Sequence, residues 1–486
     1  MKKIISFILG LSAAFGALAQ VVAVRLSEPG TLARELGSQK ETAVTLKVAG
    51  PLNSADFKTL WEASLYGELR HLDLSEADPE GCGIPDNAFW DRSVQAGGDA
   101  VKLESVVLPS NLEAIGKYAF SWAVALKSVT FPSSLRQLGR SCFSHCKSLT
   151  GDPFTLPEGV SEIPQSCFME CGSLTNVTLP NTIKGIGTNA FYNCDLAAIN
   201  FPDELESIGD MAFYGCLLKN VALPASCGSI HGKYIFGLNP ELVSLALPDG
   251  MVVIPEAIAQ DCRQLTTLRL PSDAKIIGNA AFENCVALRE VRFPEGLECI
   301  GTGAFRGCHQ IEELDLPSSL SVLGQLAFCE LPRLQRVYCK AIYPPMCEEY
   351  ITNHEHGTLK GSFGEIEEKP AGSATPRGIP VFVPTGSENA YRGIWSWNYF
   401  TNIQGTSTFP GEAAIGLVND SENIQRVTVR GNELSISALS GTAFEIFLID
   451  GTRIAGGTVS ELPVTISLPT GVYIVKVGEA VCKVAM

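Results

Sequence analysis

Residues 270–317 read LPSDAKIIGNAAFENCVALREVRFPEGLECIGTGAFRGCHQIEELDLP, a stretch in which one pattern is written twice. Between successive prolines the pattern runs through an apolar residue followed by Gly, an Ala-Phe pair, a cysteine, and an apolar triplet. The triplet ends as Val291-Arg292-Phe293, and such alternation is typical of a β-strand, whose successive side chains point to opposite faces. We therefore expect one strand per copy, with Val291 and Phe293 inward and Glu290 and Arg292 outward.

The same proline recurs backwards along the chain at intervals of 22 to 25 residues, at Pro109, Pro132, Pro157, Pro180, Pro202, Pro224, Pro248, Pro271, Pro294 and Pro317. A fixed period of this length predicts a solenoid, because one turn cannot bury its apolar face without a neighbour. We expect a β-rich solenoid of parallel strands over residues 69–340, one strand per turn. An N-terminal cap is expected over residues 20–68, in which Ser54–Leu65 has a helical pattern.

These repeats resemble the leucine-rich repeats of BspA-like bacterial proteins, whose pattern is L-P-x-x-L-x-x-I-G-x-x-A-F-x-x-C. The resemblance covers residues 69–340. It implies a leucine-rich-repeat fold with a cap at its start, and a role in adhesion to host matrix proteins.

Beyond Phe328 the period fades, and Lys340 stands where a proline is due. Residues 341–403 are expected to form an irregular loop and a C-terminal cap, in which aromatic residues such as Trp397 cover the open end of the solenoid. Residues 404–423 are expected to be a linker. Residues 424–486 alternate like short strands and predict a small antiparallel β-sandwich. Its sequence resembles the C-terminal sorting domains of type IX secretion, which implies passage across an outer membrane, although the chain does not end on the basic residues usual in that family.

Residues 1–19 have the pattern of a secretory signal peptide, with Lys2-Lys3, an apolar run and a cleavage site at Ala19-Gln20. This predicts a secreted or surface-exposed protein, and the resemblance to type IX sorting domains implies the outer surface of a Gram-negative bacterium. No other apolar run reaches the about 18 residues that a membrane-spanning helix needs. The formal net charge of −16 argues against nucleic-acid binding, which requires a basic surface.

The 16 cysteines allow a disulfide framework, a metal site or a buried ladder of thiols. Seven of them fall in one slot of the repeat, which favours a core ladder of free thiols; they are Cys146, Cys171, Cys194, Cys216, Cys262, Cys285 and Cys308. No histidine or carboxylate completes a metal site beside Cys142–Cys146 or Cys167–Cys171, and His354 with His356 is read as a polar loop. We expect no metal, no cofactor and no catalytic residues, since the sequence lacks the common catalytic motifs.

The outward strand positions change character along the chain, from small uncharged residues to charged and aromatic ones. A ligand-binding face is therefore expected at Arg269, Glu290, Arg292, Glu313, Asp315, Arg336 and Tyr338. The alternative interpretation is a solvated face whose opposite charges pair across turns. The function we expect is binding of a protein partner, such as a host matrix protein, at the cell surface. The alternative function is a glycan-binding or carbohydrate-active protein that uses residues 346–400, with Trp395, Trp397 and Tyr399.

Overall fold

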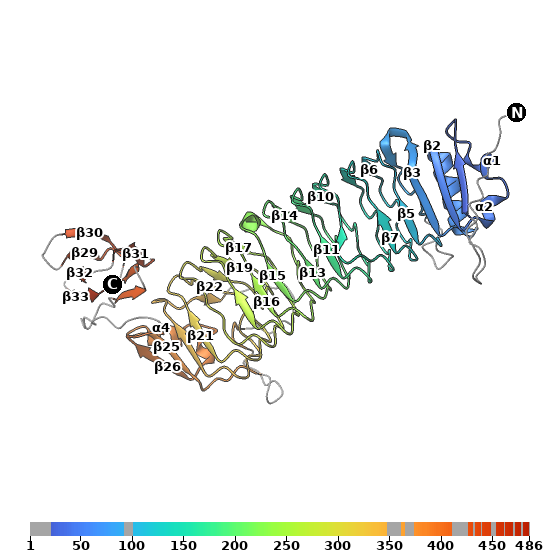
Figure 1. Ribbon diagram of the computed structural model, residues 1–486. Coiled ribbons are helices and arrows are strands. Elements are labelled where there is room, and N and C mark those ends of the chain that lie inside the picture. Colours follow the sequence, from blue (N-terminus) through green and yellow to red (C-terminus); the bar gives the residue numbers. More distant parts are fainter. Residues whose placement is uncertain are drawn as a thin grey trace, which may run out of the picture. The chain divides into compact units, whose positions relative to one another are not determined.

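The computed structural model describes residues 21–91, 101–347, 361–364, 374–410, 426–430, 433–438, 440–448, 453–460, 462–469, 472–477 and 480–485. The chain divides into two compact units, which we call unit 1 (residues 1–248 and 258–263) and unit 2 (residues 249–257 and 264–486). The expected signal peptide, His354 and His356 lie outside the described residues. Figure 1 shows the parallel strands of each unit lying side by side.

Unit 1 begins with a segment of strand and helix that extends the sheet of the repeats. The order is β1 (Val21–Arg25), α1 (Leu32–Leu36), α2 (Gln39–Thr42), β2 (Thr45–Leu52) and α3 (Ser54–Leu65). The strands pair in parallel in the order β1, β2, β3 (His71–Pro79). The helix predicted at Ser54–Leu65 is confirmed, and it starts with a capping box in which Asn53 and Asp56 bind each other's backbone N–H groups.

The first ladder of unit 1 consists of the strands predicted from the apolar triplets. The sheet started by β1, β2 and β3 continues through two further strands, β5 (Ser105–Val107) and β7 (Ser128–Thr130). A second sheet contains β9 (Phe154–Thr155), β11 (Asn176–Thr178) and β13 (Ala198–Ile199). The strands β15 (Asn220–Ala222) and β16 (Ser244–Ala246) pair with each other. All these pairings are parallel, as the repeat predicts.

A second parallel ladder, which the sequence did not predict, lies on the return path at the apolar residue that precedes Gly or Pro. It consists of two-residue strands, the first six of which are β4 (Gly83–Ile84), β6 (Ala114–Ile115), β8 (Gln137–Leu138), β10 (Glu162–Ile163), β12 (Gly185–Ile186) and β14 (Ser207–Ile208). β4 follows η1 (Glu80–Cys82), and η3 (Ala225–Ser229) follows β15. Pro85 follows β4 and Pro164 follows β10, whereas glycine follows the other four strands and allows close stacking; a Cβ on Gly139 would lie 2.4 Å from the backbone of Gly116.

A third side of each turn is formed by the segment around the repeated phenylalanine. Here two residues per turn have positive φ, as in Tyr118 (57°) and Trp122 (60°). The N–H groups of Tyr118, Phe120 and Trp122 donate to carbonyl oxygens of the following turn over 3.0, 2.8 and 2.8 Å. We infer that these hydrogen bonds offset the backbone strain, which is of order 1 kcal/mol or more per left-handed residue.

The phenylalanine rings stack on one another inside each unit. In unit 1 the ring of Phe120 lies 5.3 Å from that of Phe143, at 3° between their planes. The fully buried rings of this unit are Phe89, Phe120, Phe143, Phe168, Phe191, Phe213 and Phe236. The seven cysteines of the repeat slot are buried too, and no disulfide joins the cysteines of the described residues. The prediction of a core ladder of thiols is confirmed.

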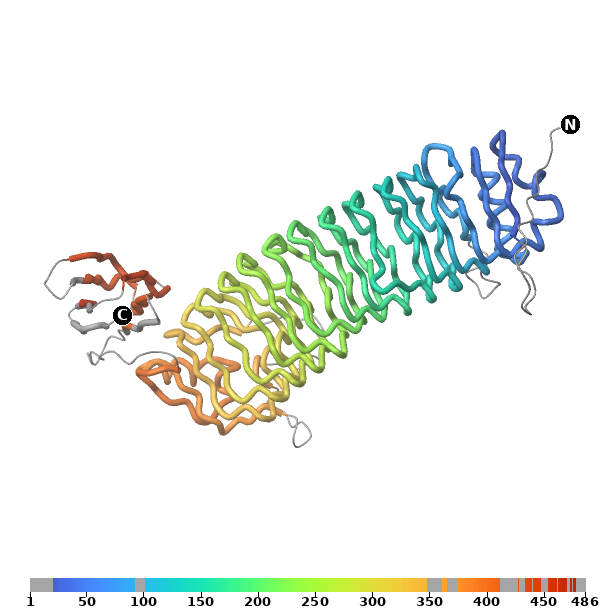
Figure 2. Tube along the Cα trace, in the orientation of Figure 1, coloured from blue at the N-terminus to red at the C-terminus, as the bar shows by residue number. Residues whose placement is uncertain are grey.

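Unit 2 has a short and a long ladder of its own, and its repeats appear as stacked turns in Figure 2. Its short ladder runs through β17 (Val253–Ile254), β19 (Ile276–Ile277), β20 (Cys299–Ile300), β22 (Val322–Leu323) and β24 (Met346–Cys347). Its long strands are β18 (Thr267–Arg269) and a sheet of β21 (Glu313–Leu316), β23 (Arg336–Cys339), β25 (Pro380–Pro384) and β26 (Asn402–Thr406). The last strand reaches into the segment predicted as a linker. Between β25 and β26 lie α4 (Glu388–Gly393) and η4 (Trp397–Tyr399).

The strand expected at Val291–Phe293 is absent, although its side chains alternate as predicted. Val291 and Phe293 are 7% and 8% exposed, whereas Leu314 and Leu316 at the same places in the next turn are fully buried. Residues 289–294 are described but have no ladder hydrogen bonds of a strand. Nothing in the structure explains this interruption.

The C-terminal part of unit 2 contains two antiparallel sheets, as predicted. One is formed by β27 (Arg426–Arg430), β28 (Glu433–Ser437) and β31 (Val464–Ser467), the other by β30 (Arg453–Thr458), β29 (Ala443–Leu448), β32 (Val472–Val477) and β33 (Ala480–Ala485). Leu434, Ile446 and Val475 belong to one apolar core that both sheets share. β30 contains Gly456 and Gly457, a pair that is more typical of a turn.

Candidate functional site

Four of the seven residues of the predicted binding face lie on two neighbouring strands of unit 2. β21 and β23 are paired in register, so that Glu313 lies beside Arg336 and Asp315 beside Tyr338. Their side chains alternate with Leu314 and Val337, which are fully buried. These four residues, Glu313, Asp315, Arg336 and Tyr338, form one outward surface, which we call the β21–β23 face.

The charged residues of the predicted face are engaged in ion pairs. Arg336 Nε lies 3.2 Å from a carboxylate oxygen of Glu313, and Arg292 Nε lies 2.7 Å from that of Glu290. A hydrogen bond from Arg292 to Glu290 raises the pKa of the guanidinium. Since these side chains are largely exposed, such pairs contribute little to stability. The Glu313–Arg336 pair crosses turns, as the alternative interpretation expects, whereas the Glu290–Arg292 pair lies within one turn.

The other three predicted residues, Arg269, Glu290 and Arg292, do not lie on β21 or β23. Glu290 and Arg292 lie in the segment that forms no strand, and their side chains are 70% and 90% exposed. Arg269 ends β18 and turns to Asp249, 2.5 Å away. The pKa of the Asp249 carboxyl is lowered by the N–H of Ser272 and by Arg269. Arg269 is therefore held by Asp249, the residue that follows the repeat proline Pro248 one turn earlier.

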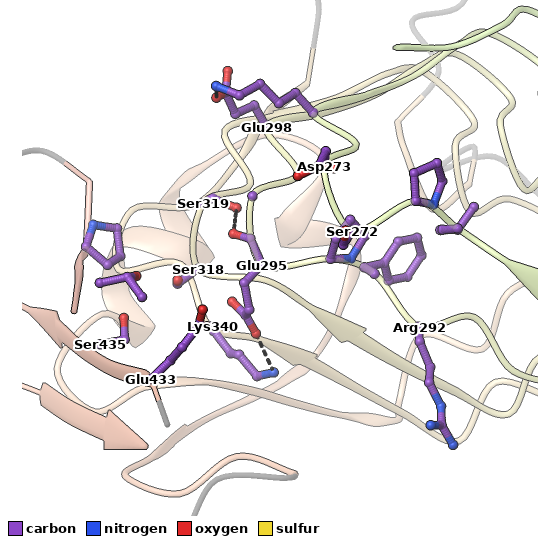
Figure 3. A pocket seen from close by; sticks show the side chains of 18 of the residues that line it. Ser272, Asp273, Arg292, Glu295, Glu298, Ser318, Ser319, Lys340, Glu433 and Ser435 are labelled. Atoms are coloured by element: carbon purple, nitrogen blue, oxygen red, sulfur yellow. Dashed lines mark hydrogen bonds and ion pairs between the residues drawn. The ribbon is translucent and has the colours of Figure 1, made fainter. Parts of the chain in front are cut away.

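Asp315 contacts Lys340, the residue at which the repeat pattern is broken. Lys340 takes the place of the repeat proline, its side chain is 2% exposed, and its Nζ lies 2.8 Å from Asp315 and 3.4 Å from Glu295. Figure 3 shows Lys340 pointing to Glu295, while Arg292 points away from both. The lysine therefore joins three successive turns, those of Glu295, Asp315 and Lys340 itself.

Tyr338 is part of an aromatic cluster that the sequence revealed only in part. Its ring stacks on that of Phe382, with centroids 4.9 Å apart, and Phe409 approaches it at 6.3 Å. Phe382 lies beside Tyr338 because β23 and β25 are neighbours in register. The segment between these strands interrupts the period, so sequence spacing could not place Phe382 next to Tyr338.

The aromatic residues expected as a lid are mostly buried. Trp397 is fully buried and its Nε1 donates to the carbonyl oxygen of Pro345 over 2.9 Å. Tyr391 is fully buried with its hydroxyl donating to Ala341 O over 2.6 Å, and Tyr399 is 4% exposed. Trp395 is half-buried. Trp397 and Tyr399 thus pack as core, which leaves the half-buried Trp395 as the most accessible of the three rings suggested for glycan contact.

A second group of aromatic side chains lines the phenylalanine side of unit 1, and the sequence analysis missed it. Trp122 stacks on His145 at 4.1 Å, and Tyr192 on Tyr214 at 5.4 Å. Burial lowers the pKa of His145. Each of these stacked contacts covers one face of both rings, which leaves less ring area for stacking on a sugar.

Within the described residues no group of three or more His, Cys, Asp or Glu side chains is arranged to hold a metal ion. None of the helices described is both long and apolar enough to span a membrane.

The stacked turns and their repeated phenylalanine and cysteine define a leucine-rich-repeat solenoid. The model of the BspA type leucine rich repeat region matches residues 98–219, 161–285 and 253–343. Together these matches span residues 98–343, just over half of the 486 residues. The chain belongs to the BspA-type leucine-rich-repeat family.

Several solved structures are similar to this chain. A leucine-rich repeat protein from Bacteroides ovatus ATCC 8483 is 23% identical, with 67% of this chain and 88% of that chain covered and a TM-score of 0.47. A leucine rich cell surface protein from Faecalibacterium prausnitzii A2-165 is 26% identical, with 52% and 82% covered and a TM-score of 0.35. The pneumococcal vaccine antigen PcpA is 17% identical, with 76% and 80% covered and a TM-score of 0.35. Among curated proteins the chain has no match.

Proposed function

We propose that this protein is exported and binds a protein partner at the cell surface, with a host matrix protein as the expected class of partner. The proposal assigns it no enzymatic activity. The observation that carries it is the β21–β23 face, where the salt-bridged Arg336 and the stacked Tyr338 lie two residues apart on β23 and share its outward side. Arginine and tyrosine are the residue types that most often anchor protein interfaces. A solenoid presents such residues on a rigid, extended surface.

The contact region of this proposal is the β21–β23 face with Phe382, extended by Glu290, Arg292 and Arg269 along the preceding turns. The rings of Tyr338 and Phe382 supply apolar area. The charged side chains of the ion pairs can break their contacts with each other and form new ones with a ligand. Such a surface, with an apolar centre and a polar rim, is the usual anatomy of an interface between proteins.

The alternative function is binding or processing of a glycan by residues 346–400. Burial of Trp397 and Tyr399 weakens this alternative, because they cannot stack on a sugar ring without disruption of the core. The Tyr338–Phe382 pair is more accessible than Trp397 and Tyr399. If a glycan binds to this pair, it would compete there with the protein partner.

The C-terminal antiparallel sheets are proposed to act as a sorting domain for type IX secretion, as their sequence resemblance implies. Residues 1–19 are proposed to be a cleaved signal peptide. Both proposals place the repeats outside the cell.

A screen of the chain from Gln20 to Met486 against matrix proteins, a glycan array and chromogenic glycosides tests the function. We expect saturable binding to a protein ligand and no glycoside turnover. Turnover of any glycoside would contradict the proposal, and binding to glycans alone would favour the alternative.

A further inference from the structure

The short ladder of unit 2 has an apolar outer surface. Parallel pairing of β17, β19, β20, β22 and β24 aligns one outward residue from each of five turns, and these residues are Val253, Ile276, Cys299, Val322 and Met346. We call this row the apolar stripe. Val253 and Ile276 are each 39% exposed and Met346 is 67% exposed, while Cys299 and Val322 are half-buried.

The fold does not require apolar residues at these positions. In unit 1 the corresponding outward residues of the short ladder are small or polar: Gly83, Ala114, Gln137, Glu162, Gly185 and Ser207. The inward residues of these strands, such as Ile163 and Ile277, are buried and apolar in both units, apart from the partly exposed Cys347 of β24. Five consecutive apolar residues on an exposed surface are therefore a property of unit 2, and contiguous patches of this kind mark contact sites.

The charges beside the stripe indicate which partner fits. Lys275 and Glu298 immediately precede Ile276 and Cys299 in the sequence, and their side chains form an ion pair of 2.8 Å while remaining 55% and 43% exposed. One cation next to one anion is a self-complementary pattern. A two-fold axis that crosses the stripe between Ile276 and Cys299 places Lys275 of each copy opposite Glu298 of the other, and Val253 opposite Val322.

We propose that unit 2 associates with a second copy of this chain through the apolar stripe, as a symmetric dimer in which the two stripes run in opposite directions. The apolar row supplies the buried area, since removal of apolar surface from water is the main driving force of association. The two Lys275–Glu298 contacts set the direction, because a parallel alignment would not bring opposite charges together in this way. This dimer leaves the β21–β23 face, on the long-strand side of the turns, to other ligands.

Sedimentation velocity of the full chain over a concentration series tests the association. We expect a reversible monomer–dimer equilibrium, and a dissociation constant at least about tenfold higher for Ile276→Asp or Val322→Asp, because a carboxylate would then be buried against apolar side chains. The matched control is Ser207→Asp, at the corresponding position of the short ladder in unit 1, which should leave the equilibrium unchanged. Circular dichroism verifies that each variant is folded.

A mixing experiment separates contacts between copies from contacts within one chain. Lys275→Glu makes both flanking charges negative and Glu298→Lys makes both positive, so each variant alone should be monomeric. When the two variants are mixed, we expect dimers that contain one chain of each kind, because every facing pair is again opposite in charge. A wild-type chain that stays monomeric at every concentration, with the stripe either bare or covered by another segment, would overturn the proposal. Failure of the mixed variants to dimerise would overturn the antiparallel arrangement.

Discussion

The thiol of Cys194 donates a hydrogen bond of 3.0 Å to the carbonyl oxygen of Phe168 in the preceding turn. The same contact, at 3.0 to 3.3 Å, is made by Cys146, Cys171, Cys194, Cys216, Cys262 and Cys308. The repeat slot therefore suits a small side chain that can donate a hydrogen bond, while Ala123 and Leu331 show that it also accepts apolar side chains without a donor. Cysteine meets both conditions, and this explains why it recurs without disulfides.

The first prediction concerns the reactivity of these thiols. Burial raises the pKa of Cys216 and of Cys262 to about 12. Native protein should therefore react slowly with a thiol reagent near neutral pH, whereas denaturant should expose about a dozen or more reactive thiols. Because the folded pKa lies above the unfolded one, the free energy of unfolding should fall as pH rises from about 8.5 towards 12. Mass spectrometry that finds most cysteines paired would contradict the prediction.

The second prediction uses Asn239, which replaces cysteine in the same slot. Its amide donates to Phe213 O over 2.8 Å and its Oδ1 accepts from the N–H of Leu218 over 3.2 Å. Replacement of Asn239 by Leu should lower the free energy of unfolding by about 2 kcal/mol or more, since two buried backbone groups lose their partners. Asn239→Cys keeps the donor and should cost less. Equal losses for the two variants in urea titrations would argue against the hydrogen-bond explanation.

The third prediction concerns Lys340. Lys340→Met removes the cation between Asp315 and Glu295 and should destabilise the protein by about 1–3 kcal/mol, less than for a fully buried pair because both carboxylates are partly exposed. The matched control is Lys184→Met, an exposed lysine paired with Glu206, for which about 0.5 kcal/mol or less is expected. Thermal unfolding of the two variants checks the difference, and a loss no larger at Lys340 than at Lys184 would refute it.

The fourth prediction tests the proposed binding face. Alanine at Arg292, Arg336 and Tyr338 together should weaken binding of the partner by about 2 kcal/mol or more, while each single change alters stability by only about 0.5 kcal/mol. The control carries alanine at Arg25, Arg34 and Tyr66, which are exposed residues of the same types in unit 1. Titration calorimetry with the ligand found in the screen gives the answer, and unchanged affinity of the first variant would place the site elsewhere.

The fifth prediction concerns the C-terminal sheets. Deletion of residues 415–486 should leave the repeats folded, because the contacts of a solenoid are made between neighbouring turns. If these sheets direct secretion, the truncated chain should accumulate in the periplasm. Cell fractionation decides this, and normal surface display of the truncated chain would count against a sorting role.

Much of the fold could be predicted because each repeat contains the residues that determine its own local structure. The proline, the Ala-Phe pair and the apolar triplet recur at one spacing, so a single copy was enough to place the inward Val291 and Phe293. The short ladder was missed for a physical reason: a two-residue strand, such as Ile276–Ile277, is too short to show alternation. Phe363 was missed because it lies in an insertion, yet it stacks on Phe328 as one more ring of the repeat.

The candidate site was less predictable, because side chains choose their partners in three dimensions. The sequence placed Glu313 and Arg336 on one surface correctly, since parallel register follows from the period. It could not tell that Arg292 would pair within its own turn, or that Arg269 would turn towards Asp249. The apolar stripe escaped notice because the short ladder that aligns it was itself unpredicted.

The hydrogen bonds on the phenylalanine side give every turn a direction. The N–H of Phe282 donates to Ala304 O, that of Phe305 to Ala327 O, and that of Phe328 to Ser362 O, so each turn offers donors to the turn that follows it. Neighbouring turns therefore make the same kind of hydrogen-bonded contact. An extra copy of the repeat inserted within either unit would accept hydrogen bonds from the N–H groups of the turn before it and would donate to the carbonyl oxygens of the turn after it. The number of repeats could therefore change by whole copies without any new kind of contact between turns, provided that the segment around Ser362, which accepts the hydrogen bond from Phe328, is kept.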